Sequence, residues 1–369
     1  MEVLLVVEHL RRSLSVGIST YALGLLQGLS ELDVAEVPSV TLHASRAPRG
    51  RRVDPLAVYG HRVAASRLPG PMLTRAWDRG LVGAPRDVAA DLLHATSLAF
   101  PSLAKSPPTS VMVHDTAWRE VPEAYPPRGR RWHEAALQRA ITGARVLLVP
   151  ARSAADALVA AGAPASRVAV IEEGADHLPP ADLDGAQRIL DGLGVRDGYL
   201  LTVGTLQPRK NLRRLLEAYA LARPELPEPW PLVVVGPEGW GDALPPAAVP
   251  HGIVLAGEVH GAELAGLYRK ARCLAFIPLV EGFGLPPVEA MRECTPVVAS
   301  AVPSLVGTGS AIEVDPLDVK AIAAALVRAS SDDRVRAELV TAGLQRSGEL
   351  TWRAAAAQHV AMWEAMVPA

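Results

Sequence analysis

The chain has 369 residues, of which 49% are hydrophobic and 21% are charged, and its formal net charge at pH 7 is −2. This length allows two domains with cores of their own, and the composition is that of a soluble globular protein. The near-neutral charge gives no general signal for nucleic acid, and no apolar run approaches the roughly 20 residues of a membrane span.

Charge and cysteine usage add little to this picture. The first 180 residues hold 20 Lys/Arg and 17 Asp/Glu, a net charge of +3, which leaves −5 for the remainder. Basic, turn-rich stretches lie at residues 46–52 and 128–131, either as solvated loops or as a rim for an acceptor or lipid head groups. The two cysteines, Cys273 and Cys294, are expected to be buried thiols in a reducing cytoplasm.

The chain begins with a predicted strand, a polar loop and a helix. The strand covers residues 3–7, so we expect no signal peptide, and the amphipathic helix begins at Gly17 (GISTY) and runs to about Leu29. A glycine at this turn suits a close approach of substrate or phosphate, although the dinucleotide pattern G-x-G-x-x-G is absent. A plain tight turn is the alternative.

Two histidines end the next predicted strands. His94 closes the sequence DLLH, and His114 precedes Asp115 in VMVHD. Functional residues gather at the carboxyl ends of parallel strands, so His114 could donate to a substrate hydroxyl. Asp115 could then fix its tautomer or accept a proton. The alternative, a histidine satisfied by local backbone, is stronger for His94.

Further strands at residues 146–149 and 168–171, with a helix at 154–161 between them, complete the first half. Residues 178–198 are rich in Pro, Gly and Asp and are the most plausible interdomain segment. We therefore predict the following organisation: a first domain at residues 1–180, a linker at 181–197, a second domain at 198–350 and a C-terminal helix at 351–369.

The second domain begins with a strand that ends at Gly204. The loop TLQPRKN then leads into a helix at residues 212–222 and places Arg209 and Lys210 near the helix N-terminus. The helix dipole and two cations together would bind a diphosphate. Two solvated cations are the alternative.

The most informative stretch is residues 276–300, FIPLVEGFGLPPVEAMRECTPVVAS. An apolar strand ends in the turn EGFG, which begins with Glu281, and two prolines then open a helix that carries Glu289. Each carboxylate can accept two hydrogen bonds from a diol, and the amides of the turn can hold a phosphate. A solvated glutamate and an ordinary helical glutamate are the alternative.

The remaining segments continue the alternation of strands and helices. Strands are predicted at residues 232–236, 253–257, 273–277 and 296–300, and helices at 319–344 and 352–366. This pattern favours an α/β protein with two facing, doubly wound Rossmann-like domains and a ligand in the cleft between them.

The segment E-G-F-G-L-P-x-x-E-A-M after a buried strand resembles the donor-site signature of retaining GT-B glycosyltransferases, glycosyltransferase family 4. The family's elements appear in order along the whole chain, and G-T-x-x-P-R-K-N is similar to its mannosyltransferase-like subgroup. The resemblance implies a retaining, metal-independent hexosyltransferase without a cofactor. It would move a mannose- or glucose-type sugar from a nucleoside-diphosphate sugar to a glycan, lipid-linked or small-molecule hydroxyl.

The resemblance also implies residue roles. Glu289 would bind the ribose hydroxyls, and Arg209 with Lys210 the diphosphate. Glu281 would contact the far hydroxyls of the sugar, and His114 would steady the sugar or an oxocarbenium-like state. Residues whose backbone would face the donor are Gly17, Gly204, Gly282, Phe283, Gly284 and Leu285.

Three departures from the family pattern leave other functions open. Thr205 stands where many members have arginine, Glu173 replaces the asparagine of N-G-x-D, and the loop after Leu305 is short. A catalytically silent nucleotide-sugar-binding protein and a GT-B nucleotide-sugar epimerase are the alternatives. The motifs fit GDP-mannose and UDP-sugars alike, and we expect a cytoplasmic protein with at most peripheral contact with the inner face of the membrane.

Overall fold

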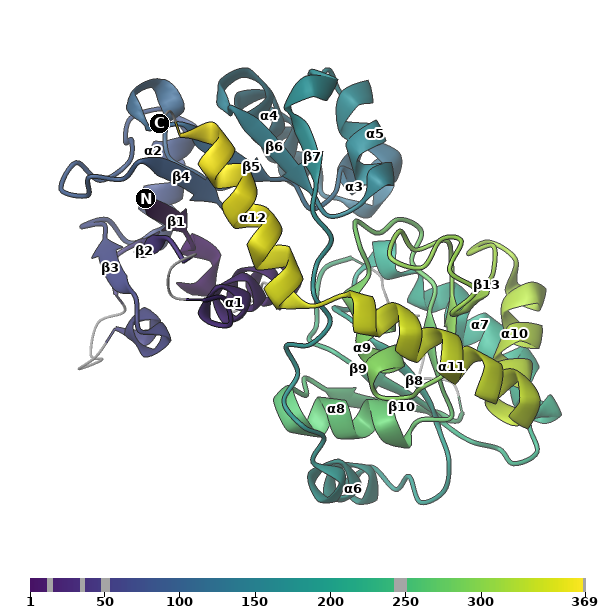
Figure 1. Cartoon of the computed structure of the whole chain (residues 1–369). Coiled ribbons are helices and arrows are strands. Elements are labelled where there is room, and N and C mark those ends of the chain that lie inside the picture. Colours follow the sequence, from purple (N-terminus) through teal and green to yellow (C-terminus); the bar gives the residue numbers. More distant parts are fainter. Residues whose placement is uncertain (12–15, 34–36, 48–53, 242–250, 368–369) are drawn as a thin grey trace. The chain divides into compact units, whose positions relative to one another are not determined.

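The structure is a computed structural model that describes residues 1–11, 16–33, 37–47, 54–241 and 251–367 (Figure 1). It divides into two compact units. Unit 1 comprises Met1–Trp118, Tyr125–Gly174 and Trp352–Ala369, and unit 2 comprises Arg119–Ala124 and Ala175–Thr351.

Unit 1 is built on a seven-stranded parallel sheet of order β3-β2-β1-β4-β5-β6-β7. Its strands are apolar runs because helices cover both faces of the sheet. The strands are β1 (Glu2–Val6), β2 (Ser39–Ala44), β3 (Arg62–Ala65), β4 (Leu92–Ala95), β5 (Thr109–Met112), β6 (Val146–Val149) and β7 (Val168–Val170). The helices are α1 (Val16–Ser30), α2 (Gly70–Asp78), α4 (Pro127–Gly143), α5 (Arg152–Ala160) and α12 (Trp352–Met366), and the short α3 (Ala117–Glu120) straddles the division between the units.

Unit 2 has a six-stranded parallel sheet of order β10-β9-β8-β11-β12-β13. Its strands are β8 (Leu200–Val203), β9 (Leu232–Val235), β10 (Ile253–Gly257), β11 (Cys273–Phe276), β12 (Val297–Ala299) and β13 (Ile312–Glu313). Its helices are α6 (Leu183–Gly192), α7 (Leu212–Ala222), α8 (Gly261–Lys270), α9 (Leu285–Arg292), α10 (Val319–Ser331) and α11 (Asp333–Glu349).

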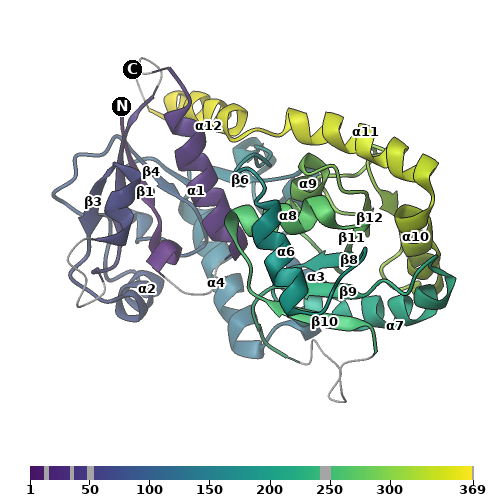
Figure 2. The same cartoon turned by 90° about the horizontal axis from the view of Figure 1, so that it is seen from below.

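Each sheet is therefore the middle layer of three. In unit 2, α6, α8 and α9 share one buried cluster with the sheet, and α7 and α10 share another on its opposite face (Figure 2). The strand order reverses between β1 and β4 in unit 1 and between β8 and β11 in unit 2. Ligands of open α/β sheets bind at the carboxyl ends of strands beside such reversals. This topology confirms two doubly wound, Rossmann-like domains.

The C-terminal helix α12 packs along α1 within unit 1 (Figure 1). The packing is tight, because a Cβ added to Gly24 of α1 would lie 2.0 Å from Cε2 of the Trp352 side chain. A Cβ added to Gly28 would lie 2.0 Å from the Trp352 carbonyl oxygen. Both glycines therefore allow α1 and the start of α12 to approach each other closely.

We expect Gly24→Ala to destabilise the protein by about 1–3 kcal/mol, the usual effect of overpacking a close-packed core. The same change at Gly17, in the same helix, meets no heavy atom within 4 Å and should be neutral or stabilising through helix propensity. Chemical denaturation of both variants measures the difference. Equal stabilities for the two variants would contradict the packing of α12 on α1.

Three sequence predictions need correction. The helix predicted at residues 319–344 is two helices, because Asp332 ends α10 and its carboxylate accepts from the N–H groups of Arg334 and Val335 at the start of α11. The predicted linker at 181–197 contains α6, which packs on α8, and it lies within unit 2, whose long segment begins at Ala175. Cys294 is exposed, since α9 ends before it.

None of the helices among the described residues combines the length and hydropathy needed to span a bilayer.

Candidate active site

A bend at the carboxyl end of β8 begins the site in unit 2. Gly204 follows the strand with a φ of +154°, and a Cβ added to Gly236, after the neighbouring β9, would lie 2.1 Å from the Gly204 carbonyl oxygen. The chain then forms a 3-10 turn, Pro208–Lys210, before α7. Asn211 fixes this turn by donating from its side chain to the Pro316 carbonyl at 2.8 Å. The turn returns Lys210 to the bend, where its Cε lies 3.6 Å from the position of a Cβ on Gly204.

Two cations of this turn share one carboxylate. Oε2 of Glu281 lies 2.5 Å from Nζ of Lys210 and 3.1 Å from Nη1 of Arg209. Nη1 of Arg209 also donates to the Val280 carbonyl at 3.0 Å, and Lys210 Nζ lies 4.8 Å from the centre of the Phe276 ring. Burial works to raise the pKa of Glu281, but the charges and hydrogen bonds of Arg209 and Lys210 lower it to about 2. The cluster therefore carries a net positive charge at neutral pH.

The structure thus brings together Gly204, Arg209, Lys210 and Glu281 where the strand order of unit 2 reverses. In this arrangement the Glu281 carboxylate faces the two cations, whereas the sequence predicted that it contacts sugar hydroxyls. Two cations beside a helix start can bind an anion with more than one charge.

The glycine turn after Glu281 positions α9. Gly284 has a φ of +98°, which favours glycine, and a Cβ there would lie 2.1 Å from Cγ1 of Val302. The side chains of Phe283 and Leu285 are buried in the core of unit 2, and Gly282 is buried as well. Phe283 and Leu285 can therefore offer only backbone groups to a ligand.

Glu289, on α9, is held by two partners that the sequence did not indicate. Its Oε2 accepts a 2.7 Å hydrogen bond from the Tyr268 hydroxyl of α8, and its Oε1 lies 3.1 Å from Nε2 of His177. Glu289 is only 7% exposed. Each carboxylate oxygen has a second lone pair, so the oriented group can still accept from a diol. No spacing pattern could identify Tyr268 or His177, because both contacts join distant elements.

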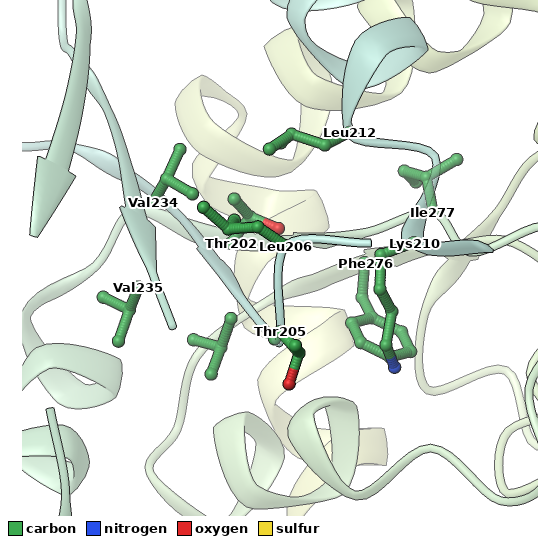
Figure 3. Close-up of a pocket in the computed structure, with 11 residues that line it drawn as sticks. Thr202, Thr205, Leu206, Lys210, Leu212, Val234, Val235, Phe276 and Ile277 are labelled. Atoms are coloured by element: carbon green, nitrogen blue, oxygen red, sulfur yellow. The ribbon is translucent and has the colours of Figure 1, made fainter. Parts of the chain in front are cut away.

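A small cavity lies under the Gly204 bend and is lined by Thr202, Gly204, Thr205, Lys210 and Phe276 among others (Figure 3). Its volume is about 20 Å³, enough for one water molecule. Figure 3 shows the hydroxyl of Thr205 and the ammonium group of Lys210 on the same side of the loop.

His114, in unit 1, lies just after β5 with both ring nitrogens against acceptors. Nε2 is 2.9 Å from the Thr96 carbonyl oxygen, and Nδ1 is 3.3 Å from Oε1 of Glu173. Burial works to lower the pKa of His114, but the Glu173 carboxylate and the Thr96 carbonyl raise it above its ordinary value. Because both neighbours can only accept, the ring satisfies them best as an imidazolium.

Glu173, rather than the predicted Asp115, contacts Nδ1 of His114. The Asp115 carboxylate accepts from the N–H of Ala117 at 3.0 Å, and Glu173 contacts His114 instead. The contact with His114 also gives a role to Glu173, which replaces the asparagine of the family's N-G-x-D pattern. His94 is fully buried between the Tyr21 hydroxyl and Ser110, and burial lowers its pKa well below the ordinary value, so it is a core histidine. Gly17 lies in α1 and has open space around it.

The raised pKa of His114 has a measurable consequence. Because its pKa is raised on folding, its stabilising contribution is complete below the unfolded value of about 6.5 and declines as pH rises through the folded value. Other charged or titratable groups that face His114 are Tyr21, His94 and Asp115.

We expect the stability difference between the wild type and Glu173→Gln to be largest below pH 6.5 and to narrow toward pH 9. Denaturation at several pH values measures this difference, and the NMR titration of the His114 ring assigns it. A difference that stays constant from pH 6 to pH 9 would mean that His114 does not titrate against Glu173 in this range, which would contradict the prediction.

Across the described part of the chain, no three or more His, Cys, Asp or Glu residues cluster in a way that could hold a metal ion.

Known proteins match both halves of the chain. Residues 16–177 match the family model Glycosyltransferase Family 4, and residues 197–332 match the model Glycosyl transferases group 1. The O-antigen chain mannosyltransferase B of Escherichia coli is 29% identical over 320 residues, which cover 84% of this chain and 80% of that protein.

Solved structures agree on the fold. HepE of Anabaena, in complex with UDP and glucose, has a TM-score of 0.73 at 17% identity and covers 99% of this chain and 100% of its own. Sucrose-phosphate synthase of Thermosynechococcus elongatus has a TM-score of 0.73 at 19% identity, with coverages of 99% and 98%. The chain thus comprises a Glycosyltransferase Family 4 region at residues 16–177 followed by a Glycosyl transferases group 1 region at residues 197–332, and its fold is that of the GT-B glycosyltransferases.

Proposed function

We propose that the protein is a retaining, metal-independent hexosyltransferase. It transfers a mannose- or glucose-type sugar from a nucleoside-diphosphate sugar to a hydroxyl of a glycan, lipid-linked or small-molecule acceptor. The observation that carries this proposal is the Arg209–Lys210–Glu281 cluster at the Gly204 bend, where the strand order of unit 2 reverses. A diphosphate satisfies the net positive charge of this cluster.

Donor recognition combines this cluster with Glu289. The Tyr268 hydroxyl and His177 orient the Glu289 carboxylate, which then accepts from the two ribose hydroxyls. Similarity to the O-antigen chain mannosyltransferase B of Escherichia coli favours mannose as the sugar. The HepE complex with UDP and glucose makes a uridine-based donor the second candidate. Both GDP-mannose and UDP-sugars are therefore the donors to assay.

In the transfer step, negative charge develops on the leaving diphosphate. The bond between the sugar C1 and the diphosphate oxygen breaks, and Lys210 and Arg209 stabilise the negative charge that the leaving group gains. The acceptor oxygen bonds to C1 on the face that the diphosphate leaves, and its proton passes to a phosphate oxygen. The anomeric configuration is retained. His114, held by Glu173 and the Thr96 carbonyl in unit 1, is assigned to steadying the sugar.

A transfer assay tests the reaction. Purified protein is incubated with GDP-mannose or a UDP-sugar and candidate acceptors, with and without EDTA, and NMR reports the anomeric configuration of the product. We expect a product of retained configuration that forms equally well in EDTA. Inverted product, or loss of transfer in EDTA that added metal restores, would contradict the mechanism. Tight donor binding without transfer or hydrolysis would favour a silent nucleotide-sugar-binding protein, and conversion of the donor sugar would favour an epimerase.

A further inference from the structure

The Tyr21 hydroxyl lies between two histidines in the core of unit 1. Tyr21 is on α1, and its oxygen is 3.0 Å from Nε2 of His94 on β4 and 2.8 Å from Nε2 of His359 on α12. All three side chains belong to residues that are at most 1% exposed. The helix α12 follows unit 2 along the chain and yet belongs to unit 1, so the contact with His359 joins residues that are 338 positions apart.

The outer partner of His359 determines the direction of its hydrogen bonds. Nδ1 of His359 is 2.7 Å from the Ala355 carbonyl, which can only accept, so Nδ1 carries the proton. Burial lowers the pKa of His359 to about 4, so at neutral pH its Nε2 is unprotonated. Nε2 therefore accepts from the Tyr21 hydroxyl, which has no second hydrogen to donate.

The bonds on the other side of Tyr21 follow from this assignment. The Tyr21 oxygen can now only accept, so Nε2 of His94 donates to it. Burial lowers the pKa of His94 well below its ordinary value, which leaves Nδ1 to accept from the Ser110 hydroxyl at 2.9 Å. The donors thus run in one direction from β5 to α12, and a buried network whose members are all satisfied has one defined geometry.

The ring that this network fixes lies against His114. The ring centres of Tyr21 and His114 are 5.0 Å apart and their planes meet at 82°, the T-shaped arrangement that aromatic pairs favour. His114 also contacts the Thr96 carbonyl and Glu173 through its two ring nitrogens. Two such contacts leave a ring able to tilt about the line through its nitrogens, and the packed Tyr21 ring opposes that tilt.

We propose that Tyr21 is a positioning residue for His114 and that His359 of the C-terminal helix holds Tyr21 in place. The docking of α12 on α1 is then a condition for the orientation of His114. That this orientation matters for sugar transfer rests on the proposed function, in which His114 steadies the sugar. The orientation itself rests on the contacts within unit 1.

Three variants test the effect on transfer. Tyr21→Phe keeps the ring and loses the hydroxyl, His359→Leu loses the acceptor, and His359→Gln offers an amide oxygen in its place. We expect Tyr21→Phe and His359→Leu each to lower kcat by about 10–100-fold, since a misplacement of about 1 Å can cost this much. The donor KM should change little, because the proposed donor-binding residues lie in unit 2. His359→Gln should recover most of the activity.

Two further variants separate positioning from a loss of stability. Leu158→Ala in α5 opens a destabilising cavity on the opposite face of the sheet and should keep the kcat of the wild type at a temperature where it is folded. In a His114→Gln background, Tyr21→Phe should cause no further loss of kcat, because Tyr21 acts through His114. An equal loss in both backgrounds, or the kcat of the wild type in Tyr21→Phe, would overturn the positioning role.

NMR titration of the His114 ring gives a readout that needs no substrate. The charged or titratable groups that face this ring are Glu173, Asp115, Tyr21 and His94. Because burial lowers the pKa of His94 and of His359, both histidines stay neutral above pH 6. A histidine of this cluster that titrates between pH 6 and pH 9 is therefore His114.

We expect Tyr21→Phe and His359→Leu to lower the pKa of His114 toward its ordinary value of about 6.5, as the contact with Glu173 loosens. Leu158→Ala should leave that pKa unchanged. If both substitutions lower the pKa and the wild type transfers no sugar, the proposed function fails and the positioning role stands. A pKa of His114 that is the same in Tyr21→Phe, His359→Leu and the wild type would overturn the positioning role.

Discussion

Replacing Lys210 by alanine is expected to lower kcat for sugar transfer by about 10²–10³-fold, the usual loss when one preorganised charge-stabilising donor is removed from an active site. Lys210 Nζ lies 2.5 Å from Glu281 and is fixed over the Phe276 ring, so its position is set before the donor binds. Removing it takes away a charge that acts on the leaving diphosphate. Steady-state kinetics with a saturating donor measure the loss.

Two companion variants sharpen this prediction. Lys320→Ala removes an exposed lysine at the start of α10 and should leave kcat unchanged. Lys210→Arg keeps the charge but changes its shape, so it should recover part of the activity. If Lys210→Ala retains the kcat of the wild type while its donor KM rises, Lys210 serves ground-state binding and has no part in stabilising the leaving group.

Replacing Glu289 by glutamine is expected to weaken donor binding by about 10–100-fold, because a charge-assisted acceptor of two ribose hydroxyls becomes a neutral one. Glutamine keeps the shape of the side chain and can still contact Tyr268, which donates to Glu289 at 2.7 Å. Isothermal titration with the nucleoside diphosphate of the preferred base gives the change in affinity.

The matched ligand is the 2′,3′-dideoxy analogue of that nucleotide. The wild type should bind the analogue about 10–100-fold more weakly than the normal nucleotide, and Glu289→Gln should bind the two about equally. If Glu289→Gln still binds the normal nucleotide more tightly than the dideoxy analogue by the wild-type factor, Glu289 does not contact the ribose. Its role would then be to hold Tyr268 and His177 in unit 2.

The repeating pattern of this fold can be predicted from local sequence. Apolar runs bounded by glycine and proline located every strand of the C-terminal sheet except the short β13, and the helices Leu212–Ala222 and Trp352–Met366 have the predicted limits. Here propensity, burial and turn residues agree. The sequence did not predict that the helix breaks at Asp332, because apolar residues continue on both sides of this position. The break arises because the Asp332 side chain caps the N-terminus of α11.

The site was predictable only where its residues lie near one another in sequence. The turn at Glu281 and the Arg209–Lys210 pair each form a local motif, and the structure joins them across 71 positions. Contacts such as Glu173 with His114 and His177 with Glu289 leave no local signature, because each side chain is unremarkable until the sheet brings it to its partner.

Thermal unfolding with a panel of nucleotides in EDTA tests most directly whether the cations at the Gly204 bend bind a diphosphate. A nucleoside diphosphate at about 100 times its dissociation constant should stabilise the wild type by about 2.7 kcal/mol, since it binds only the folded state. The parent nucleoside should stabilise far less, and Lys210→Ala should lose most of the diphosphate effect. No stabilisation by any nucleoside diphosphate, or equal stabilisation of Lys210→Ala and the wild type, would contradict the account.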